Sequence, residues 1–109
     1  MEVKRGDLVT IALSGDYGKP RPALVVQDDA YAALPSITVL RVTSELHDWP
    51  LFRVTIDPSP ANGLQKRSQV MIDKAATVPR AKLGQYIGHI GAEAMDSVGG
   101  LLAKFLGLD

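Results

Sequence analysis

The spacing of short apolar stretches limits what this chain can fold into more than any other feature of its sequence. These stretches are either continuously apolar or alternate with polar residues, and Gly, Pro and Asp separate them at short intervals. This pattern is typical of strands in a small β sandwich or barrel. We therefore predict a mainly β fold, rich in strands with short helices. The expected strands are Asp7–Leu13, Pro22–Gln27, Ser36–Thr43, Leu51–Ile56 and Gln85–Ile90, and residues 68–78 are expected to form one strand or a pair of strands.

One sustained helical period lies near the end of the chain. An apolar stripe recurs every three or four residues, at Met95, Val98, Leu102 and Phe105. It predicts an α-helix over Ala92–Leu106 that packs on the core and ends before Gly107. Gly99 and Gly100 each weaken this helix by about 1 kcal/mol relative to alanine, so its stability must come largely from docking. Shorter helical turns are expected within residues 28–34 and 79–83.

Chain length and composition predict one domain over residues 1–109. With 46% hydrophobic residues, a chain of 109 residues can form one ordinary core but not two. No apolar run approaches the roughly 20 residues that a membrane span needs, and the first residues have no apolar signal core. We expect a soluble, cytoplasmic protein without membrane contact.

The residue types exclude several kinds of chemistry. Cysteine is absent, which excludes disulfides, thiolate metal sites and a cysteine nucleophile. His47 and His89 are the only histidines and have no paired ligand spacing, and His89 lies among apolar residues, as a half-buried structural histidine would. The chain has no phosphate-binding glycine loop. We therefore expect no metal and no cofactor.

Charge is balanced overall but unevenly distributed. The chain has 12 basic residues (Lys and Arg) and 12 acidic residues (Asp and Glu), and this balance argues mildly against nucleic-acid binding. Residues 65–82 nevertheless carry five basic residues and one acidic residue, whereas residues 28–57 are mostly acidic. The basic stretch is either a solvated face or a surface for anions, and charge alone does not decide between them.

Arg21 lies between two prolines at the start of a buried strand. Proline restricts the residue before it, so Lys19 and Arg21 are both biased toward extended geometry. The Arg21 guanidinium is therefore pre-positioned at the mouth of the strand. It could pair with a nearby acid, Asp16 or Asp28, or it could bind an anionic ligand.

Five segments, in this order, resemble the MazF/PemK (Kid) family of toxin endoribonucleases. Each motif is weak alone, but their common order along nearly the whole chain is specific. The segments are Lys4–Val9, similar to an R-G-D/E start; Gly18–Val26, similar to G-x-x-R-P-A-V/L-V-V; Val42–Ser44; Gly63–Ser68, similar to G-L-x-K-D-S; and Lys82–Gly88, similar to R-L-G-x-x-I-G.

The resemblance implies a fold and a set of partners. The fold would be a small SH3-like or plasmid-maintenance-toxin β-barrel with a C-terminal α-helix. The protein would be a homodimer that binds single-stranded RNA, and a cognate antitoxin would fill the RNA groove with its acidic C-terminal tail. Operator DNA would be bound only by the toxin–antitoxin complex.

The resemblance also implies a reaction, which is metal-independent, sequence-specific cleavage of single-stranded mRNA to 2′,3′-cyclic phosphate and 5′-hydroxyl ends. Such cleavage would inhibit translation and growth. Arg21 and Thr43 match the positions used for cleavage, and Ser44 is a secondary candidate for orienting the phosphate. A guanidinium suits this role because it donates two hydrogen bonds to phosphate oxygens and stays charged.

The general acid and base are less well indicated. Some family members use an Arg-x-Asp pair on the strand that here reads Val70-Met71-Ile72-Asp73, so Asp73 matches the acid and Met71 replaces the arginine. His47 could titrate near neutral pH, but it could equally be an exposed loop residue. The expected RNA-binding residues are the cations Lys19, Lys66, Arg67 and Lys74, with Tyr17 and Trp49 as possible stacking platforms.

Two alternatives stay open. A DNA gyrase-poisoning toxin shares this barrel and dimer, but its action would not require Arg21 and Thr43. A non-catalytic barrel that binds RNA or protein would explain the methionine at position 71. Trp49 could also simply pack beside Pro50 and Phe52.

Overall fold

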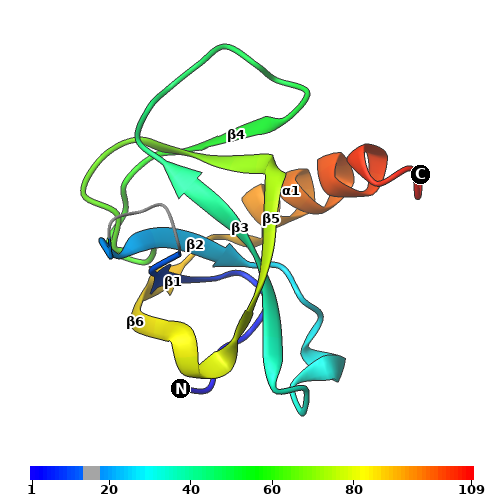
Figure 1. Cartoon of the computed structure of the whole chain (residues 1–109). Coiled ribbons are helices and arrows are strands. Elements are labelled where there is room, and N and C mark those ends of the chain that lie inside the picture. The colour runs from blue at the N-terminus through cyan, green and yellow to red at the C-terminus, as the bar shows by residue number, and fades with distance from the viewer. Residues whose placement is uncertain (14–17) are drawn as a thin grey trace.

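The computed structural model describes residues 1–13 and 18–109 and consists of six strands, two 3₁₀ turns and one helix (Figure 1). The predicted strands are confirmed, and their ends differ from the prediction by at most two residues; residues 68–79 form one strand rather than a pair. The strands are β1 (Asp7–Ile11), β2 (Arg21–Val25), β3 (Ser36–Thr43), β4 (Arg53–Ile56), β5 (Ser68–Pro79) and β6 (Leu83–His89). The 3₁₀ turns are η1 (Asp29–Tyr31) and η2 (Arg80–Lys82), and the helix is α1 (Ala92–Phe105).

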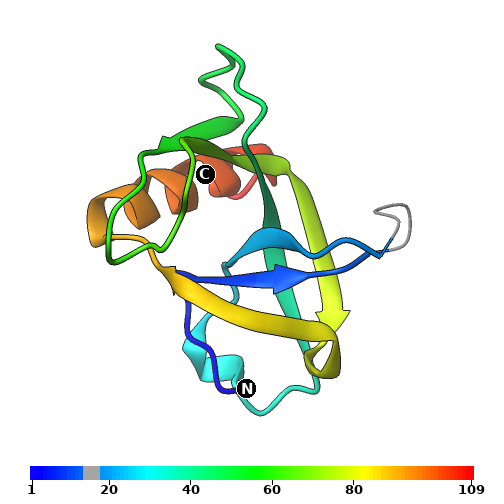
Figure 2. The same cartoon turned by 90° about the vertical axis from the view of Figure 1, so that its left-hand side faces the viewer.

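The strands form one antiparallel sheet in the order β4-β5-β3-β2-β1-β6. The sheet curls until the chain after β4 meets β6, where the His89 N–H donates to the carbonyl of Ala61 at 3.0 Å (Figure 2). Gly88 makes this contact possible, because a Cβ at that position would lie 2.4 Å from the Ala61 oxygen. The curled sheet and C-terminal helix match the predicted small barrel.

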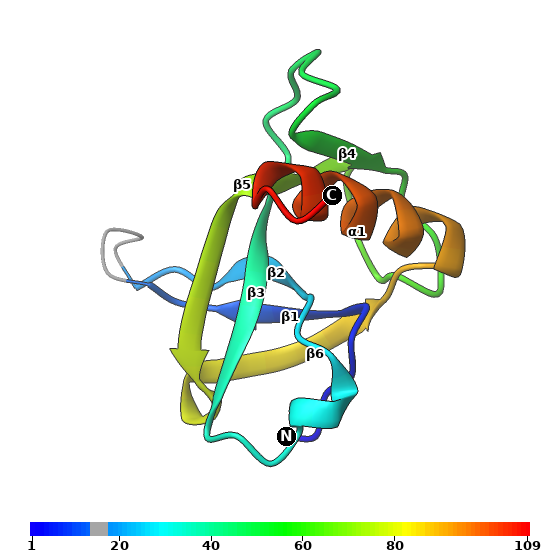
Figure 3. The same cartoon turned by 90° about the vertical axis from the view of Figure 1, so that its right-hand side faces the viewer.

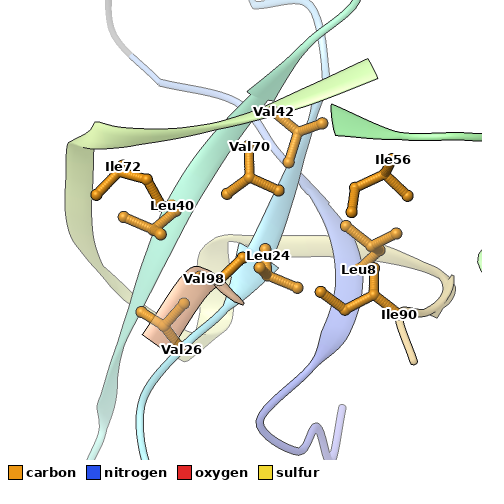
Figure 4. Packing of buried hydrophobic residues seen from close by; sticks show 10 residues of the cluster. All are labelled: Leu8, Leu24, Val26, Leu40, Val42, Ile56, Val70, Ile72, Ile90 and Val98. Carbon is orange, nitrogen blue, oxygen red and sulfur yellow. The ribbon is translucent and has the colours of Figure 1, made fainter. Parts of the chain in front are cut away.

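Curling buries both faces of the central strands. Leu8, Leu24 and Leu40 belong to a first apolar cluster, whose ten buried members are drawn in Figure 4. Their neighbours Val9 and Val25 point to the opposite face and belong to a second cluster. Strands buried on both faces are continuously apolar rather than alternating, as β2 is.

Helix α1 covers the first cluster and packs against β4 and β5 (Figure 3). Val98 is fully buried, and Met95 and Leu102 are partly buried against the cluster, as the stripe predicted. Phe105 differs, because it is 54% exposed. Gly107 follows the helix with φ +73°, a conformation that favours glycine at this position. Across the described part of the chain, no helix combines the length and apolarity needed to cross a membrane.

A large bulge bends β5. Leu40 pairs with Ala75 and Val42 pairs with Val70, so residues 71–74 of β5 lie opposite the single residue Arg41 of β3. Bulges increase twist and redirect the side chains around them. The strand therefore serves both clusters, with Val70 in the first and Val78 in the second (Figure 1).

The loop between β4 and β5 is held by a buried amide. Asn62 is only 4% exposed; its side-chain oxygen accepts from the N–H groups of Ser59 and Leu64, and its amide nitrogen donates to the carbonyl of Asp57 at 2.8 Å. The following residue, Gly63, has φ +66° and lies against Ile87 of β6. The loop is thereby fixed against the end of the sheet.

Two glycine-to-alanine changes should shift stability in opposite directions. Gly88→Ala should lower the free energy of unfolding by about 1–3 kcal/mol, because its Cβ meets backbone rather than a movable side chain. Gly100→Ala, on the exposed side of α1 with open space around it, should raise that free energy by about 0.5–1 kcal/mol. Urea unfolding followed by circular dichroism measures both. A stable Gly88→Ala variant would contradict the close contact between β6 and the loop after β4.

Candidate functional site

An open hollow of about 640 Å³ lies where the start of β2, the end of β3 and the loop before β5 meet. Most of its polar lining comes from residues that the sequence singled out or from their neighbours. These residues are Arg21, Arg41, Thr43, Ser44, Glu45 and Lys66, and we call the space the Arg21 hollow. Met71 and Ile87 contribute to its apolar lining.

The pairing of β2 with β3 brings the key side chains together. Ala23 is the partner of Arg41 in this antiparallel ladder. Arg21 precedes Ala23 by two residues and Thr43 follows Arg41 by two. Side chains two residues apart share a face, and antiparallel partners lie opposite each other. Arg21, Arg41 and Thr43 therefore project from one face at the same end of the two strands.

The hollow has an excess of positive charge. Three cations line it, namely Arg21, Arg41 and Lys66, whereas Glu45 is the one acid among the described lining residues. Thr43 and Ser44 add hydroxyl groups to the same lining. Guanidinium groups and hydroxyls are the usual partners of phosphate oxygens. The chemistry of the hollow suits a phosphodiester.

A local hydrogen bond orients Thr43. Its hydroxyl oxygen accepts from the N–H of Glu45 at 3.1 Å, in a turn that ends β3. The hydroxyl proton is still able to donate to a ligand. Thr43 thus has a fixed oxygen and an available donor.

Of the two acids considered as partners of Arg21, Asp28 is engaged elsewhere. Its carboxylate caps η1 by accepting from the N–H of Ala30 at 2.9 Å. Asp16 lies outside the described residues, as does Tyr17, one of the predicted stacking platforms. Arg21 itself is exposed at the entrance of β2.

A second buried amide holds the loop that follows Ser44. Gln69 is 5% exposed and makes four hydrogen bonds. Its oxygen accepts from the His47 N–H at 3.1 Å and from Arg53 Nη1 at 2.9 Å. Its nitrogen donates to the carbonyl of His47 at 2.9 Å and to the Thr55 hydroxyl at 3.2 Å. One side chain therefore ties this projecting loop to β4 (Figure 1).

His47 and Trp49 lie in this loop as a stacked pair. Their ring centroids are 3.8 Å apart and the rings are nearly parallel, at 4°. Trp49 also packs on Phe52, one of the two alternatives considered for it from the sequence, and the Arg53 guanidinium lies 4.9 Å from the centre of its ring. The His47 Nε2 is 3.3 Å from Glu45 Oε1, so His47 contacts the hollow through one lining carboxylate.

The β5 bulge separates Met71 from Asp73. Met71 lines the Arg21 hollow, whereas Asp73 lines a second, more apolar hollow of about 480 Å³ with Phe52 and Phe105. Residues two apart on a regular strand share a face, but those in a bulge need not. Because the bulge breaks the regular alternation, Asp73 does not follow Met71 into the Arg21 hollow.

The remaining predicted cations divide into three groups. Lys66 lines the Arg21 hollow. Arg67 pairs with Asp57 at 3.0 Å, and Lys74 pairs with Asp73 at 3.4 Å. Lys19 is exposed two residues before Arg21.

The expectation that His89 is half-buried was wrong. Its ring is exposed on β6 and its Nδ1 is 3.3 Å from the Tyr86 hydroxyl. The reason is that β6 lies at the edge of the sheet, so its outward face meets solvent.

Sequence reasoning missed Arg41, Glu45 and Gln69. Arg41 could have been found, because it lies two residues before Thr43 on a predicted strand and so shares its face. Nothing in the sequence distinguishes Gln69 from an exposed glutamine. Within residues 1–13 and 18–109, no three His, Cys, Asp or Glu side chains gather in a group able to hold a metal ion.

Replacing Gln69 should loosen the projecting loop and report through fluorescence. Gln69→Leu leaves the His47 N–H without its acceptor and removes one of the two oxygens that accept from Arg53 Nη1, the other being the Glu45 carbonyl, which should lower the free energy of unfolding by about 2 kcal/mol. Trp49 is the only tryptophan, so its emission monitors the stack directly. We expect stronger acrylamide quenching in the variant. Gln85→Leu, at an exposed glutamine of β6, is the control, and equal quenching in both variants would refute the role of Gln69.

Comparison with known proteins agrees with this architecture. The family model described as "PemK-like, MazF-like toxin of type II toxin-antitoxin system" matches residues 4–106. A probable endoribonuclease MazF of Mycolicibacterium smegmatis is 44% identical over 107 residues, covering 97% of this chain and 98% of that protein. Endoribonuclease EndoA of Bacillus subtilis is 31% identical over 104 residues, covering 90% and 89%.

The fold recurs in solved structures. The MazE-MazF (Form-II) crystal structure from Deinococcus radiodurans has a TM-score of 0.79 and 26% sequence identity, with 100% of this chain and 99% of that chain covered. The family model and the relatives span nearly the whole sequence, including all five motif segments. This chain therefore belongs to the PemK-like, MazF-like toxin family of type II toxin–antitoxin systems.

Proposed function

We propose that this protein is a toxin that cuts single-stranded mRNA at specific sequences without a metal, leaving 2′,3′-cyclic phosphate and 5′-hydroxyl ends and so inhibiting translation and growth. The observation that carries the proposal is the convergence of Arg21 and Thr43 in one positively charged hollow. The endoribonuclease names of two relatives support the activity.

The proposed reaction is an internal displacement at phosphorus. The 2′-oxygen forms a bond to phosphorus while the bond from phosphorus to the 5′-oxygen breaks. The 2′-hydroxyl proton passes to a base, and the departing 5′-oxygen receives a proton. Negative charge grows on the non-bridging oxygens, and donors fixed in advance, such as Arg21 and the Thr43 hydroxyl, stabilise it.

The proton acceptor we assign is Glu45, supported by its position in the hollow and by its contact with His47. A carboxylate in the lining would accept the proton of a 2′-hydroxyl bound beside it, and His47, 3.3 Å from Glu45 Oε1, would exchange a proton with that carboxylate. Asp73 lines the other hollow and is a weaker candidate for this step. Ser44 would orient the phosphate beside Thr43.

RNA on either side of the cut would contact the surrounding cations. Lys66 is within the hollow, and Lys19, Arg67 and Lys74 would act as backbone clamps outside it. Trp49 is 41% exposed and, together with His47, offers an aromatic edge for a base. Tyr17 remains a further stacking candidate.

The same hollow would bind the acidic C-terminal tail of a cognate antitoxin, because its excess positive charge complements carboxylates. The MazE-MazF crystal structure from Deinococcus radiodurans, which has the same fold, supports such a partner. Operator DNA would be bound only by the complex, and the protein would act in the cytoplasm. A gyrase poison of this fold, or a non-catalytic barrel, would not need Arg21 with Thr43.

Cleavage of a mixed-sequence RNA in EDTA tests the activity. We expect Arg21→Ala and Thr43→Ala to lower kcat by about 100-fold or more, since each removes a donor to the developing charge. Glu45→Gln should also lower kcat. Arg80→Ala, whose side chain bonds to the Leu34 carbonyl at the other end of β5, is the matched control. Product ends are mapped chemically.

Uncut RNA with every substrate would overturn the nuclease proposal in favour of a gyrase poison or a binder. Cleavage that survives Arg21→Ala would instead leave the nuclease but remove Arg21 from its site. Cleavage abolished by EDTA would contradict the metal-independent reaction.

The proposed homodimer would cover the apolar hollow beside α1. Leu51 and Phe105 line it, and they are 80% and 54% exposed. A second copy is the proposed occupant, because a two-fold contact would bury both apolar sets at once. Leu51→Ser with Phe105→Ser should shift the mass measured by analytical ultracentrifugation from dimer to monomer. Leu34→Ser, an exposed leucine beside η1, should leave it unchanged. A wild-type monomer would refute the dimer.

A further inference from the structure

Arg41 gives the Arg21 hollow a second guanidinium that the motif comparison does not assign. It lies on β3 opposite Ala23, and its side chain lines the same hollow as Arg21 and Thr43. Arg21 is displaced from it by two residues along the partner strand. Such diagonal neighbours lie roughly 7–8 Å apart, within reach of long side chains.

Two guanidinium groups that line one hollow favour a bound anion between them. Like charges that lie close together repel each other, and an anion bound by both relieves that repulsion. A bound phosphodiester has two non-bridging oxygens, and each arginine can donate to them through its planar fork. The hydroxyls of Thr43 and Ser44 lie in the same lining. The hollow therefore has more donors than a single ground-state oxygen needs.

The β5 bulge interrupts the ladder opposite Arg41. Residues 71–74 lie opposite this one residue, so regular ladder pairing stops there. Met71 from the bulge lines the hollow without adding charge. At this part of the lining the positive charge therefore comes from Arg41 of β3 and not from β5.

We propose that Arg41 is a second catalytic arginine, which binds the scissile phosphate together with Arg21. This inference rests on the proposed RNA cleavage. As the bond from the 2′-oxygen to phosphorus forms and the bond to the 5′-oxygen breaks, the non-bridging oxygens gain negative charge. Arg41 donates hydrogen bonds to these oxygens and keeps its own proton. It therefore stabilises the transition state more strongly than it stabilises the RNA bound before reaction.

Replacing Arg41 and measuring how the loss of activity divides between kcat and KM tests this role. We expect Arg41→Met to lower kcat by about 100-fold with a much smaller change in KM. Arg41→Lys should retain an intermediate rate, because it keeps the charge but loses the planar fork. Binding is measured separately with RNA carrying a 2′-deoxy nucleotide at the cut, which cannot react.

Salt dependence distinguishes a shared phosphate from a separate one. If Arg41 and Arg21 hold one phosphate, Arg41→Met should leave the slope of log Kd against log salt nearly unchanged. If Arg41 binds a different phosphate, the slope should fall by about 0.7 for single-stranded RNA. A reduced slope with unchanged kcat would overturn the proposal.

A double variant tests whether the loss of kcat in Arg41→Met comes from the missing charge or from a change in the structure. Arg41→Met combined with Met71→Arg returns a guanidinium to the same space from β5. We expect this double variant to recover part of the lost kcat. Urea midpoints of all variants check folding, and a folded double variant without any recovery would contradict a role for charge in the hollow.

Failure of the proposed role of Arg41 can be distinguished from failure of the proposed nuclease function. Wild-type protein that fails to cut any RNA overturns the nuclease and, with it, the catalytic role of Arg41. Wild-type cleavage that Arg21→Ala abolishes but Arg41→Met leaves intact overturns only the proposal for Arg41.

Discussion

The antiparallel pairing of β2 with β3 is the contact on which the candidate site depends. Residues of the two strands that face each other along the buried part of the ladder are apolar, and they belong to two clusters on opposite sides of the sheet. A slip of one residue would turn every side chain to the other face. Leu24 and Leu40 would then have to exchange clusters with Val25 and Val39, and Arg41 would turn to the face of the first cluster, so the packing of both clusters fixes the register. The same register that aligns Leu24 with Leu40 puts Arg21 beside Thr43 at the strand ends.

Around these strands, two buried amides hold the loops that complete the hollow. Asn62 organises the segment that presents Lys66, and Gln69 organises the loop that begins at Ser44. Burying an amide is unfavourable unless its donors and acceptors are paired, and both side chains meet that condition with several partners. Because these two amides hold the loops, the polar groups of the hollow are already in position before a ligand binds.

The sheet could be predicted from sequence because its signal is local. Each of the six strands is an apolar or alternating stretch with turn residues around it, and β3 was predicted with the observed bounds. The bend of β5 could not be predicted in the same way, since a bulge depends on how two distant strands pair. Regular alternation therefore grouped Met71 with Asp73, whereas the structure turns them into different hollows. The exposure of Phe105 and His89 likewise depends on which elements happen to cover them.

The sequence by itself determined the class of fold and the family, and it predicted two residues of the candidate site, Arg21 and Thr43. It could do so because hydrophobic periodicity and the prolines around Arg21 act on neighbouring residues. Only the tertiary structure decided that Arg41 and Glu45 join them, that Gln69 supports the adjacent loop and that Asp73 lies elsewhere. Those facts follow from strand register, the bulge and the curl of the sheet, which bring together residues far apart in the chain.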